Sequence, residues 1–184
     1  EPHDLESSAH WHDAQRDIVT DVRARAPEHT FIVTGADWGG IDGLSRLAPL
    51  DDTNLVYSFH FYDPMNFTHQ GATWGFAPWA GMKNVPWPAT PEQLERVADR
   101  LTKDESSKAL RWSARKDSPD PWTKKALAER LNQAKEWGAR HGVPLYCGEF
   151  GVHAAPAPKD SRVAWHRAVC ETLRAANIGM AMWD

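Results

Sequence analysis

Glu149 is the residue of this chain whose surroundings most favour chemistry. It lies between Gly148 and Phe150, at the end of the apolar run 143–150. A carboxylate held at the end of a buried strand is partly desolvated and rigidly placed, which suits a nucleophile or a proton-transfer group. A structural ion pair at the strand end is the alternative interpretation.

Polar and aromatic side chains also stand at the ends of three other strand-like runs. Trp38 follows the run 30–34, His60 and Tyr62 end the run 54–62, and Trp183 ends the run 178–183. The carboxyl edge of a parallel sheet is where α/β proteins place their sites. We therefore expect these side chains at the same edge as Glu149.

The strand-like runs alternate with segments that have helical periodicity. Apolar residues recur at spacings of three and four in 8–26 and 160–176, and Pro91 and Pro121 are placed to open further helices. The expected elements are helices at 8–26, 41–48, 91–103, 121–140 and 160–176, strands at 30–34, 54–62, 143–150 and 178–183, and loops at 63–90 and 104–120. This alternation predicts βαβ units and a parallel sheet, with 30–34 as a fully buried strand.

Composition narrows the class of protein. The chain has 184 residues, which fits one domain over 1–184, and 21 Lys+Arg against 25 Asp+Glu give a net charge of −4. That balance argues against a protein that binds nucleic acid by neutralising phosphates. No apolar run is long enough to span a bilayer, and no Gly-rich phosphate loop is present.

Tryptophan is unusually frequent, with ten Trp but only three Tyr. Indole rings offer flat faces to sugar rings, although about half of them are expected simply to fill the core. Trp112, Trp122, Trp137 and Trp165 fall on helices or helix starts and are assigned to packing. The stretch from Phe67 to Trp87, which also carries Trp74 and Trp79, either forms a wall of a substrate cleft or packs on its own aromatic side chains.

Several strings together resemble glycoside hydrolase family 5, the cellulase family of retaining (β/α)8-barrel enzymes. They are Glu1-Pro2-His3, Val33-Thr34-Gly35-Ala36-Asp37-Trp38-Gly39-Gly40, Ser58-Phe59-His60-Phe61-Tyr62-Asp63-Pro64, Phe67-Thr68-His69-Gln70-Gly71-Ala72, Gly148-Glu149-Phe150-Gly151 and Ala181-Met182-Trp183-Asp184. The resemblance implies an α/β fold, a TIM barrel of which this chain covers the segment from the end of strand 4 to strand 8.

The resemblance also implies roles for individual residues. Glu1 matches the general acid/base of the family and Glu149 matches its nucleophile. His60 and Tyr62 match the strand-six His-x-Tyr, and Trp183 matches the strand-eight Trp under the cleaved sugar. Trp38 is a weaker candidate for a leaving-group subsite. A separation of about 5–5.5 Å between the two carboxyl groups would indicate retention of anomeric configuration.

The implied function is an endo-acting glycoside hydrolase that cuts a β-1,4-glucan such as cellulose. The alternatives are a β-mannan or mixed-linkage glucan hydrolase, or a partial barrel that binds carbohydrate without cleaving it. The expected partner is a polysaccharide or oligosaccharide, with no nucleic acid, no membrane, no metal and no cofactor. We expect a secreted, extracellular or periplasmic protein that is a monomer when its barrel is complete.

The two ends of the chain favour a portion of a larger barrel. The chain begins at Glu1-Pro2 without Met, so we expect a signal peptide to be absent or already removed, and the chain ends on a strand-like run. We expect residues 1–184 by themselves to aggregate or to be inactive, because an opened barrel exposes strand edges.

Histidines and cysteines outside the proposed site favour structural roles. His10 and His12 are two apart and point to different sides of a helix, so a metal site with His3 is disfavoured. Cys147 in a strand and Cys170 in a helix are expected as reduced core residues rather than as a bridge.

Overall fold

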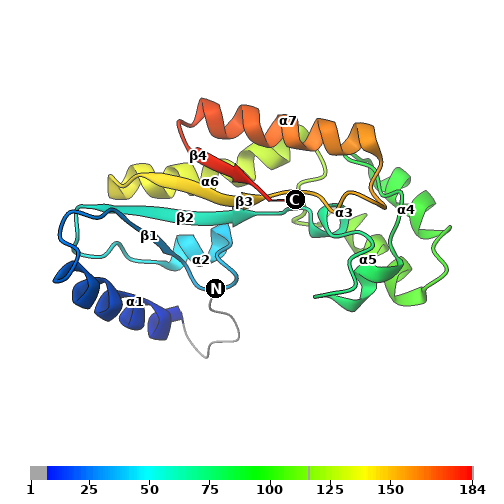
Figure 1. Cartoon of the computed structure of the whole chain (residues 1–184). Coiled ribbons are helices and arrows are strands. Elements are labelled where there is room, and N and C mark those ends of the chain that lie inside the picture. Colours follow the sequence, from blue (N-terminus) through cyan, green and yellow to red (C-terminus); the bar gives the residue numbers. More distant parts are fainter. Residues whose placement is uncertain (1–7, 116, 184) are drawn as a thin grey trace. The chain divides into compact units, whose positions relative to one another are not determined.

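The computed structural model describes residues 8–115 and 117–183, and these form a parallel α/β fold (Figure 1). In chain order the elements are α1 (Ser8–Arg23), β1 (Phe31–Thr34), α2 (Ile41–Arg46), β2 (Leu55–Phe61), α3 (Met65–Thr68), the 3₁₀ helix η1 (Ala77–Gly81), α4 (Pro91–Ala98), α5 (Asp104–Ser113), α6 (Lys124–His141), β3 (Leu145–Phe150), α7 (Lys159–Ala175) and β4 (Gly179–Met182). All four expected strands are present, and the expected helices at 8–26, 41–48 and 160–176 are confirmed to within a few residues.

The chain divides into two compact units. Within the described residues, unit 1 contains residues 8–61, Leu131–Phe150 and Leu173–Ala181, and unit 2 contains the described residues of Tyr62–Arg130, Gly151–Thr172 and 182–183. Unit 1 carries nearly all of the sheet, while unit 2 carries the short helices between β2 and α6. The assignment of residues 1–184 to one partial catalytic domain stays a prediction.

The sheet has the strand order β1-β2-β3-β4, with β1 and β3 both parallel to β2. Phe31 pairs with Leu55, and Tyr57 pairs with Leu145. The carboxyl ends of the three parallel strands therefore meet at one edge, which is the edge that carries His60 and Glu149.

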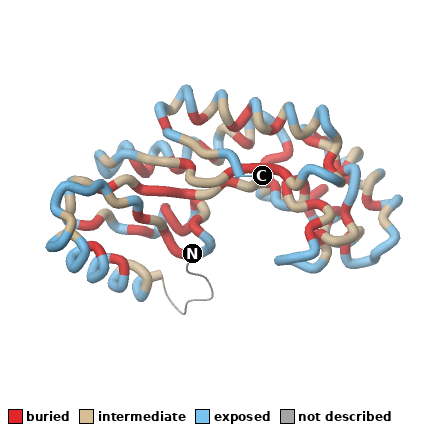
Figure 2. Tube along the Cα trace, in the orientation of Figure 1, coloured by how far each residue is buried: buried red, intermediate tan, exposed pale blue. Residues whose placement is uncertain are grey.

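The core of unit 1 is built on β2, which is buried on both faces. Tyr57, Phe59 and Phe61 point one way and are at most 1% exposed, and Ser58 on the opposite face is also buried. Figure 2 shows β2 as mostly buried, with residues of intermediate exposure between the buried ones. Because β2 is covered on both faces, the run 54–62 carries apolar residues at positions of both faces rather than on one face alone.

Helix α1 is attached to β1 by side chains of its inner face. The indole N–H of Trp11 donates to the Thr34 carbonyl at 2.7 Å, and the Gln15 amide oxygen accepts from the Thr34 N–H at 2.9 Å. Within the described residues β1 has a neighbouring strand on one side only. The two bonds from α1 therefore satisfy the N–H and carbonyl of Thr34 on the other side.

The expectation that 30–34 is a fully buried strand is wrong. In β1 only Val33 is buried, and Ile32 is 63% exposed. The physical reason is position, since β1 is the outer strand of the described sheet and an apolar, β-branched run does not reveal whether a strand is central or outer.

Residues 104–120 are not all loop, because Asp104–Ser113 forms α5. Its first turn carries Asp104 and Glu105, which suit the positive end of the helix dipole, and Leu110 is fully buried. Arg111 of α5 pairs with Glu95 and Asp99 at α4, the second at 2.5 Å. The loop expected over 104–120 is therefore wrong for Asp104–Ser113, whose charged side chains lie on the exposed side of a helix.

Two other helix boundaries differ from expectation. Helix α4 ends at Ala98 rather than 103, and α6 begins at Lys124 rather than at Pro121. The Thr123 hydroxyl accepts from the Ala126 N–H at 3.1 Å, so a threonine rather than the proline opens α6.

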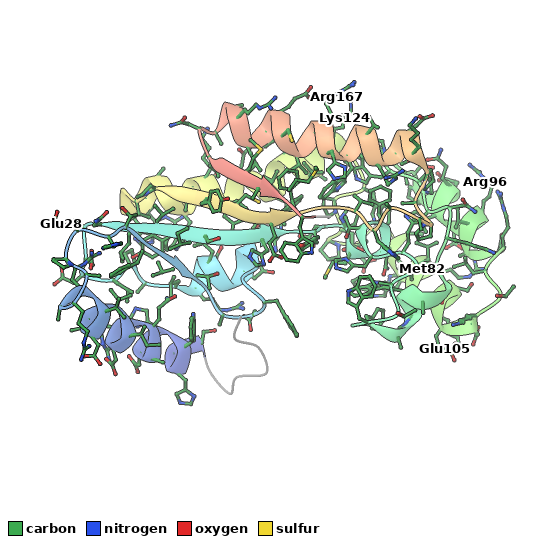
Figure 3. All side chains as sticks on the ribbon, viewed as in Figure 1. Glu28, Met82, Arg96, Glu105, Lys124 and Arg167 are labelled. Carbon is green, nitrogen blue, oxygen red and sulfur yellow. The ribbon has the colours of Figure 1, made fainter. Side chains whose placement is uncertain are left out.

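Unit 2 has its own core beneath a charged surface. Large side chains that are at most 1% exposed fill it, namely Phe67, Met82, Val85, Trp87, Leu94, Leu110, Leu127, Trp165 and Val169. Figure 3 labels Met82 in this core and shows Arg96 and Glu105 directed away from the ribbon. No helix within the described ranges is long and apolar enough to cross a membrane.

Candidate functional site

Glu149 and His60 form the centre of the site in unit 1. His60 Nδ1 lies 3.3 Å from Glu149 Oε2, and their side chains are 11% and 25% exposed. Both residues stand at the carboxyl edge of the sheet, on the neighbouring strands β2 and β3. The sequence expectation that both side chains lie at the same edge of the sheet is confirmed, while their catalytic roles stay a prediction.

A β-bulge in β3 is what places Glu149 beside His60. Phe59 pairs with Cys147, but His60 pairs with Glu149, so Gly148 is an extra residue that faces no partner. Without this register shift Gly148 would pair with His60, and Glu149 would pair with Phe61 and point to the other face of the sheet, because side chains alternate along a strand.

Glycine is required at position 148 by the close approach of Ser58. A Cβ at this position would lie 2.6 Å from the Ser58 hydroxyl oxygen and 3.5 Å from His60 Nε2. The bulge therefore depends on a small residue on β3 opposite a buried serine on β2. Neither Gly148 nor Ser58 was singled out for a role from the sequence, although Gly-Glu at a strand end is a signal for a bulge.

Trp38 sits on a strained turn next to His60. Asp37, Trp38 and Gly39 all have left-handed backbone, with φ of 57°, 59° and 68°. Non-glycine residues in this region cost energy and mark sites that the surroundings hold in place. The His60 N–H donates to the Gly39 carbonyl at 2.8 Å, which ties the turn to β2 and presents the Trp38 indole, 61% exposed, to solvent.

Tyr62 lies in unit 2, where a short segment braces it. The Thr68 hydroxyl donates to the Tyr62 carbonyl at 2.5 Å, and the His69 ring meets the Tyr62 ring edge-on with centroids 5.1 Å apart. His69 also stacks on Trp79 at 4.5 Å. Both Thr68 and His69 belong to the Phe67–Ala72 string, for which the sequence suggested no individual roles.

Burial keeps the His69 imidazole neutral. Desolvation is the main cause that lowers the pKa of His69 from 6.5 to about 4, and nearby His153 adds to it. Because the Thr68 hydroxyl is used as a donor to Tyr62, the network assigns the proton of His69 to Nδ1, which donates to Thr68 Oγ1 at 2.9 Å.

The same segment fastens two further loops of unit 2. The Gln70 side chain accepts from the Val85 N–H at 2.9 Å and donates to the Phe67 and Val85 carbonyls at 2.9 and 3.1 Å. The His153 N–H donates to the Thr68 carbonyl at 2.8 Å. Gln70 is fully buried, and its side-chain amide satisfies backbone groups that would otherwise lack hydrogen bonds inside unit 2.

The remaining predicted site residues are Trp183 and Glu1. Trp183 is 61% exposed, and its carbonyl approaches Gly151 so closely that no side chain would fit there. Glu1, the expected acid/base, lies outside the described residues. No group of three or more His, Cys, Asp or Glu side chains within 8–115 and 117–183 is arranged to hold a metal ion.

The tryptophans divide between core and surface. Trp79, Trp87, Trp122, Trp137 and Trp165 are buried, whereas Trp38, Trp74, Trp112 and Trp183 are more than half exposed. The assignment of Trp112 to packing is therefore wrong, because it lies on the outer side of a short helix rather than under it. The sequence left two interpretations of the stretch 67–87, packing on its own aromatic side chains or a wall of a substrate cleft. Trp79 and Trp87 pack inward, as the first interpretation requires, whereas Trp74 is exposed, as the second requires.

Parallel strands with a carboxylate and a histidine at their carboxyl edge, and with exposed indole rings in both units, define an α/β protein whose site is built at the strand ends. The family model of cellulase, glycosyl hydrolase family 5, matches residues 1–184, and the chain belongs to this family.

Two curated proteins named endoglucanase are similar to the chain over most of its length. Endoglucanase C of Acetivibrio thermocellus is 31% identical over 177 residues, which are 96% of this chain and 49% of that protein. Endoglucanase 3 of Fibrobacter succinogenes is 29% identical over 171 residues, which are 91% of this chain and 26% of that protein. The chain thus spans half or less of the length of these relatives.

A solved structure confirms the fold. The endoglucanase Cel5A of Thermotoga maritima superposes with a TM-score of 0.74 and 27% identity, covering 100% of this chain and 49% of Cel5A. The resemblance stated from the sequence and the expected partial α/β barrel are therefore confirmed.

Proposed function

We propose that the chain forms part of a retaining, endo-acting β-glycosidase that hydrolyses a β-1,4-glucan by a two-glutamate double displacement. The observation that carries the proposal is the Glu149 carboxylate at the carboxyl edge of the sheet, 3.3 Å from His60 Nδ1. The relatives named endoglucanase support the substrate class.

In the proposed reaction Glu149 is the nucleophile. Its carboxylate oxygen forms a bond to the anomeric carbon while the glycosidic C–O bond breaks, and a proton from Glu1 goes to the leaving oxygen. Glu1 then takes a proton from water, whose oxygen displaces Glu149 and releases the sugar. His60 orients the Glu149 carboxylate, and we assign Tyr62, Trp183 and Trp38 to binding the sugar chain.

A β-mannan is the second candidate substrate. Cel5A of Thermotoga maritima, 27% identical to this chain, has been solved with cellobiose and with mannotriose. A polymer substrate is met outside the cell, so we also propose that the protein is secreted, to an extracellular or periplasmic location.

The experiment measures hydrolysis of an aryl β-cellobioside by the protein that carries this chain. Glu149→Gln keeps the shape of the side chain but removes the nucleophile, so activity should fall by about 10³-fold or more. Glu171→Gln, on the exposed side of α7, is the matched control and should leave the rate unchanged.

The anomer formed first tests the stereochemistry. Proton NMR of the early product should show the β-anomer, and product of the opposite configuration would contradict the double displacement. Full activity in Glu149→Gln would remove Glu149 from the mechanism, and faster turnover of mannan than of glucan oligosaccharides would favour the second candidate.

A further inference from the structure

A groove of about 340 Å³ lies in unit 2, within the part of the chain that the structure describes. Helix α5, helix α3 and the segment before η1 provide its walls, and it has no assigned role. Its volume falls in the range of sites that take small ligands, about 300–1,000 Å³.

Aromatic rings form the apolar surfaces of the groove. Trp112 and Phe76 line it and are 52% and 51% exposed, and Met65 beside them is 40% exposed. Trp79 is nearly buried and forms the floor, meeting the Phe76 ring edge-on with centroids 5.7 Å apart. Large side chains exposed together mark binding sites rather than ordinary surface.

The polar part of the groove consists of oxygen acceptors. Asp63, Asn66 and Asp120 line it, and none of its lining residues within the described ranges is Lys, Arg or His. Arg130 Nε donates to Asp63 Oδ2 at 3.2 Å, which offsets one of the two carboxylate charges. Such a rim suits a neutral ligand rich in hydroxyl donors and disfavours an anion.

Hydrogen bonds hold floor and rim together before any ligand arrives. The Trp79 indole N–H donates to Asn66 Oδ1 at 2.9 Å, the Asn66 amide donates to the Ser113 hydroxyl at 2.9 Å, and that hydroxyl donates to Asp120 Oδ2 at 2.7 Å. A site fixed in this way loses little side-chain freedom on binding.

We propose that this groove binds a segment of a β-linked glucan chain, with sugar rings against Trp112 and Phe76 and hydroxyl groups donating to Asp120 and Asp63. The choice of a β-glucan rests on the proposed function. The groove itself is defined by flat rings and oxygen acceptors, which match the apolar faces and hydroxyl edges of a pyranose chain.

The test follows the Trp112 ring directly in the protein that carries this chain. The protein is labelled with 5-fluorotryptophan in the Glu149→Gln background, and the Trp112 signal in the ¹⁹F spectrum is assigned by its loss in Trp112→Phe. Cellohexaose should shift this signal saturably, and maltohexaose, which has the same size but α-linkages, should not.

Variants then measure what the ring and the rim contribute to cellohexaose affinity by calorimetry. Trp112→Ala should weaken binding roughly tenfold, as for a central aromatic contact. Trp112→Phe, which keeps a flat ring, should lose less affinity than Trp112→Met, which keeps apolar area without one. Asp120→Asn still accepts from Ser113 and should weaken binding about threefold.

The outcomes separate the groove from the proposed function. A Trp112 signal that cellohexaose leaves unmoved, in a protein whose Glu149 form hydrolyses β-glucan, overturns the groove alone. A shifting signal without hydrolysis keeps the groove and rejects the proposed function. A signal that moves with protein concentration instead identifies a second copy as the occupant and rejects the glucan.

Discussion

At the scale of single residues, the site depends on how one extra residue turns a carboxylate to the correct face. Gly148 shifts the register of β3 by one position, and that shift brings Glu149 opposite His60. The position of the proposed nucleophile therefore depends on a glycine and a serine to which we assign no catalytic role.

The Gly148–Ser58 contact predicts a loss and its rescue. Gly148→Ala places a methyl group 2.6 Å from Ser58 Oγ and should cost about 1–3 kcal/mol of unfolding free energy. In the double variant Ser58→Ala/Gly148→Ala the nearest remaining atom is His60 Nε2 at 3.5 Å, an ordinary contact. Urea unfolding should show most of the stability restored in the double variant, and equal losses in both would refute this explanation.

His69 predicts a pH dependence of stability. Its pKa falls from 6.5 to about 4 on folding. Between pH 4 and pH 6.5 the imidazole is therefore protonated in the unfolded chain and neutral in the folded chain. Stability is therefore complete above pH 6.5 and decreases as the pH falls towards 4, by about 3 kcal/mol in total.

Urea midpoints at pH 7 and pH 5 measure this effect. His69→Gln should reduce the difference between the two midpoints, whereas His10→Gln, at an exposed position of α1, should leave it unchanged. An unaltered difference in His69→Gln would assign the acid sensitivity to other groups.

At the scale of elements, one arginine fixes the end of α1 to the sheet. Arg23 donates to both carboxylate oxygens of Asp52, at 2.8 and 3.1 Å, and to the carbonyls of Ala26, Pro27, His29 and Asn54. Its guanidinium also lies 4.0 Å from the centroid of the Phe31 ring. A planar group with several donors is needed for all these contacts.

Arg23→Lys should therefore destabilise unit 1 although the charge is kept. The ammonium cannot bind both oxygens and several carbonyls at once, and we expect a loss of about 1–3 kcal/mol in urea unfolding. Arg16→Lys on the same helix is the control, because its pairs with Asp13 and Asp17 are exposed to solvent and should contribute little to stability. Equal losses in the two variants would contradict the special role of Arg23.

The acid side of the stability curve offers a second check on Arg23. Its hydrogen bonds are the main cause that lowers the pKa of Asp52. The stability from this pair is present above the ordinary pKa of an aspartate and is lost as the pH falls through the lowered value. Arg23→Lys should make that loss smaller.

At the scale of the whole molecule, the chain combines two compact units with two unbridged cysteines. Cys147 is fully buried in unit 1, and Cys170 is partly buried in unit 2. The helices α6 and α7 each contribute residues to both units. Each helix has a continuous ladder of backbone hydrogen bonds, so we expect cooperative unfolding.

Thiol labelling along a urea gradient tests this expectation. Cys147 in Cys170→Ser and Cys170 in Cys147→Ser should become reactive over the same urea range. Two midpoints separated by more than the width of one transition would show that the units unfold independently.

The amino-acid sequence by itself determined the order and type of most elements. Periodic apolar residues and short β-branched runs report local geometry, so β1 to β4, α1 and α7 were all expected. The polar residues at the strand ends, Glu149 and His60, were also expected together, because parallel strands bring their carboxyl ends to one edge. Local pattern and global fold agree at these positions.

Only the tertiary structure decided the features that depend on neighbours distant in the chain. Position 148 needs a glycine because Ser58 of another strand lies against it, and Ile32 is exposed because β1 is an outer strand of the described sheet. The charged segment of α5 becomes a helix through contacts with α4, and its Trp112 stays exposed beside Phe76. Burial, register and ring contacts are set by packing, which a local pattern does not specify.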